Sequence, residues 1–261
     1  MTVVEIAFRA VVFLGFGLVF GSFLTVVVHR VPVGESLARP RSRCPVCGRQ
    51  LRAVDNVPVV AWVLLRGRCH WCGARIPIVY PLLELATGVL FAAAALRHED
   101  WWVAAMLAPF LGVLVALAVI DIRTKKLPNR IVYPALLVSA VLLVAARLAG
   151  GAVDLLDAAI GFAAYGGGLL IVALISPRGM GMGDVKLAAL IGLVLGALGL
   201  EYVAVAAGLG ILFGGVGAIV ALLLGAGRKQ ALPFGPFLAA GAGVAAFAAP
   251  QVADRYLGLF T

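Results

Sequence analysis

Eight apolar runs, separated by polar segments, constrain this chain more than any other feature. At a rise of 1.5 Å per residue, about 20 residues cross the ~30 Å hydrocarbon core of a bilayer. Most of the runs approach or exceed that length, whereas the sixth and the eighth have 14 residues each. The sequence therefore predicts an all-α polytopic membrane protein of about eight transmembrane helices. The runs are Ala10–Val28, Ile78–Leu96, Trp101–Ile120, Ile131–Leu148, Leu155–Ile175, Leu187–Leu200, Tyr202–Ala226 and Phe237–Pro250.

The composition excludes the two main alternatives to a membrane protein. Apolar residues make up 63% of the chain and charged residues 13%, whereas a soluble domain is about half apolar and a quarter charged. A soluble globular protein is excluded on that ground, and disorder is excluded because it requires low hydrophobicity. The first run is 19 residues long and has no basic segment before it, so we interpret it as a retained helix rather than a signal peptide.

The basic residues predict the orientation in the membrane. Of the 21 lysines and arginines, 17 lie in alternate loops of the eight-helix arrangement. Such loops face the cytoplasm, which places both termini outside. Because the net charge of +9 comes from these loops, no nucleic-acid partner is predicted. The four loops are Arg30–Arg75, Asp121–Arg130, Ser176–Lys186 and the segment that holds Arg228 and Lys229.

The first cytoplasmic loop carries the four cysteines in two CxxC pairs. Cys44 and Cys47 are separated by 21 residues from Cys69 and Cys72, and a glycine follows each pair. Two such pairs can offer four thiolates in the tetrahedral geometry that Zn²⁺ prefers. The alternatives are two disulfides or four free thiols, and a reducing cytoplasm disfavours the disulfides. Because four sulfurs leave no open position, the zinc is predicted to be structural, and His70 is not assigned as a ligand.

Two aspartates are predicted to lie at the same face of the membrane. Asp121 ends the third apolar run, and Asp184 precedes the sixth. Two carboxylates at one depth can share a proton and hydrolyse a peptide bond, one as base and the other as acid. The structural alternatives are a helix-end pair of Asp121 with Arg123 or Lys125, and an N-cap role for Asp184.

The residues around Asp184 suggest how a substrate could be positioned. Gly181 and Gly183 leave backbone without a Cβ near the membrane face, where an extended substrate could pair as a strand. Lys186 either holds a carboxylate or lipid phosphate, or marks the cytoplasmic face.

The motifs, taken in order, resemble those of bifunctional type IV prepilin peptidases and N-methyltransferases, which belong to the GxGD group of membrane aspartic proteases. The likeness runs nearly from end to end. The motifs are GSFL at 21–24, HRVP at 29–32, RCPxC at 43–47, RGRCxxCG at 66–73, YPLxEL at 80–85, Asp121 with Pro128 and Asn129, GMGDVK at 181–186 and PFGP at 233–236.

This resemblance implies eight helices with a zinc loop, and a catalytic pair formed by Asp121 and Asp184. It implies cleavage of prepilins or pseudopilins of pilus and type II secretion systems at the cytoplasmic face of the bacterial inner membrane. The new N-terminal residue would then be methylated from S-adenosylmethionine. The organisation that follows is a first helix at 1–28, a methyltransferase-associated zinc loop at 29–77 and a peptidase core at 78–261. Membrane lipids are the other expected partner, and the residues predict no oligomeric state.

Three alternatives remain open on the residues alone. Glu84 is either a buried acid paired with an arginine of the loop, or a contact to the methyl donor or the substrate amine. The enzyme could cleave without methylating. The chain could also be a non-catalytic transporter or scaffold that docks partners through its zinc loop.

Overall fold

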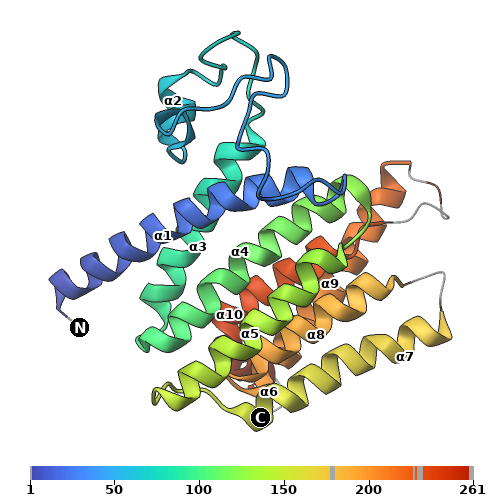
Figure 1. Cartoon of the computed structure of the whole chain (residues 1–261). Helices are drawn as coiled ribbons and strands as arrows, with labels where there is room; N and C mark the ends of the chain where they lie inside the picture. Colours follow the sequence, from blue (N-terminus) through green and yellow to red (C-terminus); the bar gives the residue numbers. More distant parts are fainter. Residues whose placement is uncertain (1, 177–179, 226, 228–231, 259–261) are drawn as a thin grey trace.

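The computed structural model describes residues 2–176, 180–225, 227 and 232–258. Arg178, Arg228 and Lys229, which were counted with the basic loops, lie outside this part of the chain. Each predicted apolar run is helical over most of its described length, which confirms the all-α class, and Ala226 lies outside the described residues. Among the described residues, seven helical segments are long and apolar enough to cross a membrane (Figure 1). They are α1 (Val3–Arg30), α3 (Val79–Arg97), α4 (Trp101–Thr124), α5 (Asn129–Leu148), the segment Leu155–Ile175, α9 (Leu200–Leu223) and α10 (Gly235–Leu257).

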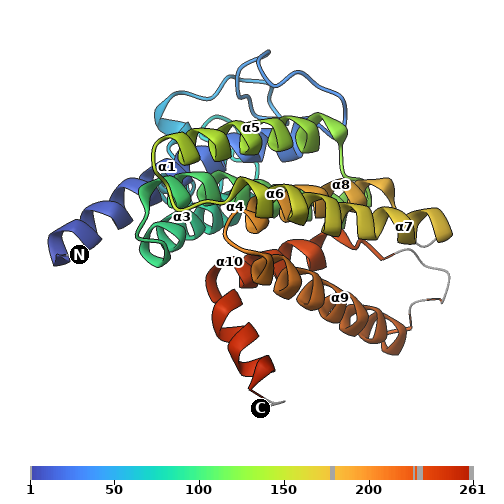
Figure 2. The same cartoon turned by 90° about the horizontal axis from the view of Figure 1, so that it is seen from below.

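The sixth apolar run forms a shorter helix than the others. Helix α8 (Met182–Gly196) has 15 residues, so it is about 22 Å long and falls short of the ~30 Å hydrocarbon core. It begins five residues before the predicted Leu187, because the segment around Asp184 is already helical. From Leu187 on, nearly all of its residues are buried, and it lies between α5 and α9 (Figure 2). A helix that is apolar all round suits such a central position.

Close backbone contacts hold α8 against the fifth predicted span. That span consists of α6 (Leu155–Gly161), a π-helical turn η2 (Phe162–Gly166) and α7 (Gly167–Ile175), so the predicted continuous helix is interrupted. A Cβ on Gly161 or Gly192 would collide with the backbone of the other residue. Gly166 packs equally closely on Ala189. Glycine lets the backbones approach to this distance.

Helix α1 packs along α3 through glycines as well. A Cβ at Gly17 would lie 2.8 Å from the Cα of Gly88, and one at Gly21 would lie 2.7 Å from the Cα of Glu84. The polar loop between the two helices contains only the short helices η1 (Val54–Asn56) and α2 (Val60–Leu64). It stands above the ends of α1 and α3 as a separate lobe (Figure 1).

We expect Gly192→Val to destabilise the protein severely. The branched side chain has no space, because the carbonyl of Gly161 occupies the position of its Cβ. Overpacking costs about 1–3 kcal/mol even where side chains can move, and here the obstacle is backbone. Thermal unfolding in detergent measures the effect. Gly208→Val is the matched control, since no atom lies within 4 Å of its added Cβ, and an equal loss in both variants would contradict this packing.

Candidate functional site

Asp121 lies in the last turn of α4 and is only 4% exposed. Its Oδ2 accepts a hydrogen bond of 3.0 Å from the backbone N–H of Gly235, the first residue of α10. The hydrogen bonds of the described residues thus give it a backbone partner, and no pair with Arg123 or Lys125 is found among them. Burial of Asp121 opposes its ionisation, whereas the Gly235 N–H and the positive end of the α10 dipole favour the ionised form.

Asp184 lies in the first turn of α8, three residues after the N-cap Gly181. It is therefore not the N-cap that one of our alternatives proposed. Burial and, to a smaller extent, the negative charge of Asp121 together raise the pKa of Asp184 from 3.8 to about 6. The two carboxyl groups, 63 positions apart in the sequence, are thus brought within electrostatic reach of each other.

The residues beside Asp184 hold α8 against the loop between α4 and α5. Gly181 is extended, with ψ of 142°, but Gly183 is already helical, so the predicted extended stretch is limited to its first residue. A Cβ on Gly183 would lie 2.9 Å from the Cβ of Leu127, which explains why this position is a glycine. Lys186 Nζ donates to Asn129 Oδ1 at 2.9 Å and lies 5.0 Å from the ring centre of Tyr133. Lys186 therefore connects α8 to the start of α5.

The four cysteines come together as predicted. The Sγ atoms of Cys44, Cys47, Cys69 and Cys72 all lie within 4.8 Å of one another, and those of Cys44 and Cys72 are 3.8 Å apart. Sulfurs placed tetrahedrally at 2.3 Å from a zinc ion would be about 3.8 Å apart, so the donor set fits that metal.

Both CxxC turns have the same backbone geometry. In the first turn, the N–H groups of Cys44 and Gly48 donate to Arg49 O and Cys44 O. Cys69 and Gly73 do the same in the second turn, with Ala74 O and Cys69 O as acceptors. Each glycine has φ of 70°, a left-handed conformation that glycine adopts without strain.

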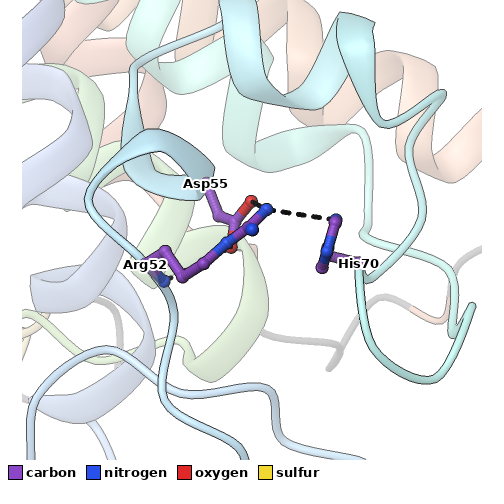
Figure 3. Close-up of polar contacts among 3 residues, drawn as sticks. All are labelled: Arg52, Asp55 and His70. Atoms are coloured by element: carbon purple, nitrogen blue, oxygen red, sulfur yellow. Dashed lines mark hydrogen bonds and ion pairs between the residues drawn. The ribbon is translucent and has the colours of Figure 1, made fainter.

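A polar cluster joins the segment that follows the first cysteine turn to the second turn (Figure 3). Arg52 makes a bidentate ion pair with Asp55, with distances of 2.9 and 3.0 Å, and Asp55 is only 4% exposed. The same guanidinium contacts His70 Nδ1 at 3.2 Å. Because arginine can only donate, Nδ1 is the acceptor in this contact. His70 thus serves this cluster, which agrees with its exclusion from the metal ligands.

Glu84 lies in α3 and holds the loop to the bundle. Its Oε2 accepts a 2.7 Å hydrogen bond from the N–H of Val59, at the start of the short helix α2. The residue is half-buried rather than buried, and its described partner is backbone rather than an arginine. A contact of Glu84 with a methyl donor stays a prediction.

Gly235 is a residue of this site whose role the residue-by-residue reasoning missed. It was noted only as part of the PFGP motif, although a Cβ there would lie 2.8 Å from Asp121 Oδ2. Asn129, the partner of Lys186, was likewise noted only as part of a motif. The sequence does contain a Gly-Pro pair at the start of an apolar run, which indicates the N-terminus of a helix. It does not indicate which residue that N-terminus contacts.

Comparisons with known proteins agree with this arrangement. Residues 16–98 match the bacterial peptidase A24 N-terminal domain, and residues 108–227 match the type IV leader peptidase family. The prepilin leader peptidase/N-methyltransferase of Bacillus subtilis (strain 168) is 35% identical over 93% of this chain and 95% of its own length. The protein of the same name from Aeromonas hydrophila is 36% identical over 94% and 92%, respectively. That from Dichelobacter nodosus is 34% identical over 86% of each chain. No solved structure matches. The chain therefore belongs to the type IV leader peptidase family.

Proposed function

We propose that this protein cleaves the leader peptide of prepilins or pseudopilins with Asp121 and Asp184 and then methylates the new N-terminus. The observation that carries the proposal is that these two carboxyl groups, from the end of α4 and the start of α8, lie within electrostatic reach of each other, since the charge of Asp121 raises the pKa of Asp184. Two carboxyl groups so close cannot both ionise cheaply, so the pair holds one proton between them. That state is the one that aspartic peptide hydrolysis requires.

The surroundings of the two residues assign different roles to them. Asp121 accepts the Gly235 N–H and faces the N-terminus of α10, so it is the ionised member that takes a proton from water. Asp184 has no such described donor from α10 and its pKa is raised, so it keeps the proton and donates it toward the scissile carbonyl. As the peptide bond breaks, the proton that Asp121 took from water passes to the leaving amine, and the tetrahedral intermediate returns a proton to Asp184 as it becomes the carboxylic acid.

The membrane orientation follows from the basic loops. The lysines and arginines concentrate in loops at the end of the bundle that carries Asp121, Asp184 and the cysteines, which supports a cytoplasmic position in the bacterial inner membrane. The apolar segment of a pilin would then lie beside the helices, and its cleavage site would reach the carboxyl pair from the membrane surface.

The cysteine cluster is assigned to structural zinc, held by Cys44, Cys47, Cys69 and Cys72. Bound zinc would fix the two turns relative to each other and supply much of the folding free energy of a loop with little apolar core. The name N-methyltransferase of the relatives implies a methyl donor, and we assign S-adenosylmethionine to that role. We assign the loop at 29–77 to methylation, and Glu84 positions that loop through Val59.

Mass spectrometry of a prepilin incubated with the purified protein tests the proposal. We expect a shortened chain, and an additional methyl group when S-adenosylmethionine is supplied. A shortened chain without the methyl group would restrict the protein to peptidase activity. An intact precursor from each of several pilin-like substrates would contradict the proposal and favour a scaffold.

We expect cleavage to decline as the pH rises above about 6. Asp184 must be protonated to act as the acid, and its pKa is raised from 3.8 to about 6, so the protonated fraction falls tenfold per pH unit above that value. The pH dependence of kcat/KM for a prepilin peptide measures this decline and reports the protonation of Asp184 in the free enzyme. Activity that stays constant from pH 5 to 9 would contradict the role of Asp184 as the acid.

A further inference from the structure

A large cavity lies between α1 and the loop that follows it, on the side of α1 away from α3. Its volume is about 550 Å³, within the range of ligand sites. Val19, Phe23 and Val26 of α1 form one wall, and the loop segments 37–42 and 50–58 form the other. Val19 and Phe23 are 65% and 48% exposed on a helix of spanning length, so this wall faces the acyl chains. The cavity is thus apolar toward the membrane and roofed by the polar loop.

Arginines supply the charge of this cavity. Arg30, Arg41 and Arg52 line it, and no acidic residue is among the described residues that do so. The charge of Arg52 is neutralised by its ion pair with Asp55. Arg30 and Arg41 therefore supply the net positive charge of the cavity. The field inside the cavity is therefore positive.

Arg30 is the most informative of the three. It is the last residue of α1 and is only 7% exposed, yet its described hydrogen bond is a single contact of 2.9 Å from Nη1 to Ser36 O. A guanidinium has five N–H donors, and those of Arg30 that have no described protein partner are available to an anion in the cavity that this residue lines. The C-terminal dipole of α1 supplies only a partial negative charge. An anionic group in the cavity would complete the site.

We propose that this cavity binds the headgroup of an anionic phospholipid such as phosphatidylglycerol. The phosphate would lie between Arg30 and Arg41, since arginine recognises phosphate with paired N–H donors. One acyl chain would follow Val19 and Phe23 along α1. The lipid would connect the transmembrane helix to the cysteine loop, whose residues form the roof of the cavity. This site is independent of the peptidase assignment.

The methyl donor fits this cavity less well than a phospholipid does. S-adenosylmethionine carries a sulfonium cation and an ammonium group beside one carboxylate, so its net charge is positive. A cavity lined by arginines and lacking a described acid repels it. The cavity also lies on the face of α1 opposite to the α3 contact, away from the helix bundle that carries Asp121.

Native mass spectrometry of the full-length, zinc-loaded protein in detergent tests the proposal. Phosphatidylglycerol and phosphatidylcholine with identical acyl chains are added at equal concentrations. We expect selective retention of phosphatidylglycerol. Arg30→Gln keeps a donor for Ser36 but removes the charge, and should weaken that retention about tenfold, the effect of losing one charge-assisted hydrogen bond. Arg75→Gln, an exposed loop arginine outside the cavity, is the matched control and should retain the lipid.

A second variant keeps the test valid if Arg30→Gln fails to fold. Val26→Trp fills the apolar side of the cavity without changing a charge, and it should also reduce retention. Val11→Trp, at an exposed position of α1 outside the cavity, should not. Equal binding of both lipids, or an equal loss in Arg75→Gln, would overturn the proposal. Displacement of the lipid by inorganic phosphate or by S-adenosylmethionine would do so as well, because the site would then belong to a soluble ligand.

Discussion

Replacing either Asp121 or Asp184 by asparagine is expected to lower prepilin cleavage by about 10⁴-fold, the upper range of what acid–base groups contribute. Asparagine has the shape of aspartate but can neither take a proton from water nor donate one to a carbonyl. Asp121→Asn also loses the anionic acceptor of the Gly235 N–H. Initial rates of prepilin shortening, followed by mass spectrometry, measure the loss. Asp254→Asn, an exposed carboxyl of α10, is the control and should cleave normally.

The Tm of the Asp184→Asn variant shows whether its lost activity comes from the missing acid or from unfolding of the protein. The pKa of Asp184 is raised above its ordinary value of 3.8, so the folded state disfavours the ionised form. Ionisation therefore costs stability progressively between about pH 4 and pH 6, and the full cost is present above pH 6. Asparagine never ionises, so Asp184→Asn should raise the Tm above pH 6 and leave it nearly unchanged below pH 4. A lower Tm at pH 8, together with lost cleavage, would indicate a structural role instead.

The parts of the site that the sequence predicts are those set by short spacing or by membrane depth. The CxxC spacing places two sulfurs on one turn, so the cluster of four needed only one long-range contact. Asp121 and Asp184 were predicted to meet because both border apolar runs on the side that the basic loops define. Neither prediction required knowledge of which helices are neighbours.

The contacts that depend on helix packing were not predictable in this way. The N–H of Gly235 reaches Asp121 because α10 starts beside the end of α4, and no local pattern specifies that crossing. An arginine of the loop was one of the partners considered for Glu84, but its described partner is the Val59 N–H. Helix α8 begins earlier than its apolar run, because Met182–Lys186 is already helical. The low hydropathy of this segment had predicted a loop. The π-helical turn in Leu155–Ile175 has no sequence signal that we recognised.

Removing the metal is expected to abolish methylation while leaving most of the cleavage. In the double variant Cys44→Ser, Cys47→Ser, the site loses two of four thiolates, so bound zinc should fall from about one ion per chain to none. Because metal binding supplies the folding free energy of such a loop, residues 29–77 should lose their structure. Metal analysis measures the first effect, and hydrogen exchange of the loop measures the second. His70→Asn is the control and should keep its zinc, since His70 contacts Arg52 rather than the cysteine cluster.

Cleavage should survive this change because the carboxyl pair rests on other elements. Asp121 is held by α4 and α10, and Asp184 by α8, which packs on α5, α6 and α9. The loop meets this core through α1 and α3, with Glu84 and Val59 as one described connection. Unfolding the loop therefore removes its contacts with α1 and α3, and we expect the two aspartates to keep their positions. An equal loss of cleavage and methylation, with the Tm of the helices unchanged, would contradict this division and place the loop in the peptidase site.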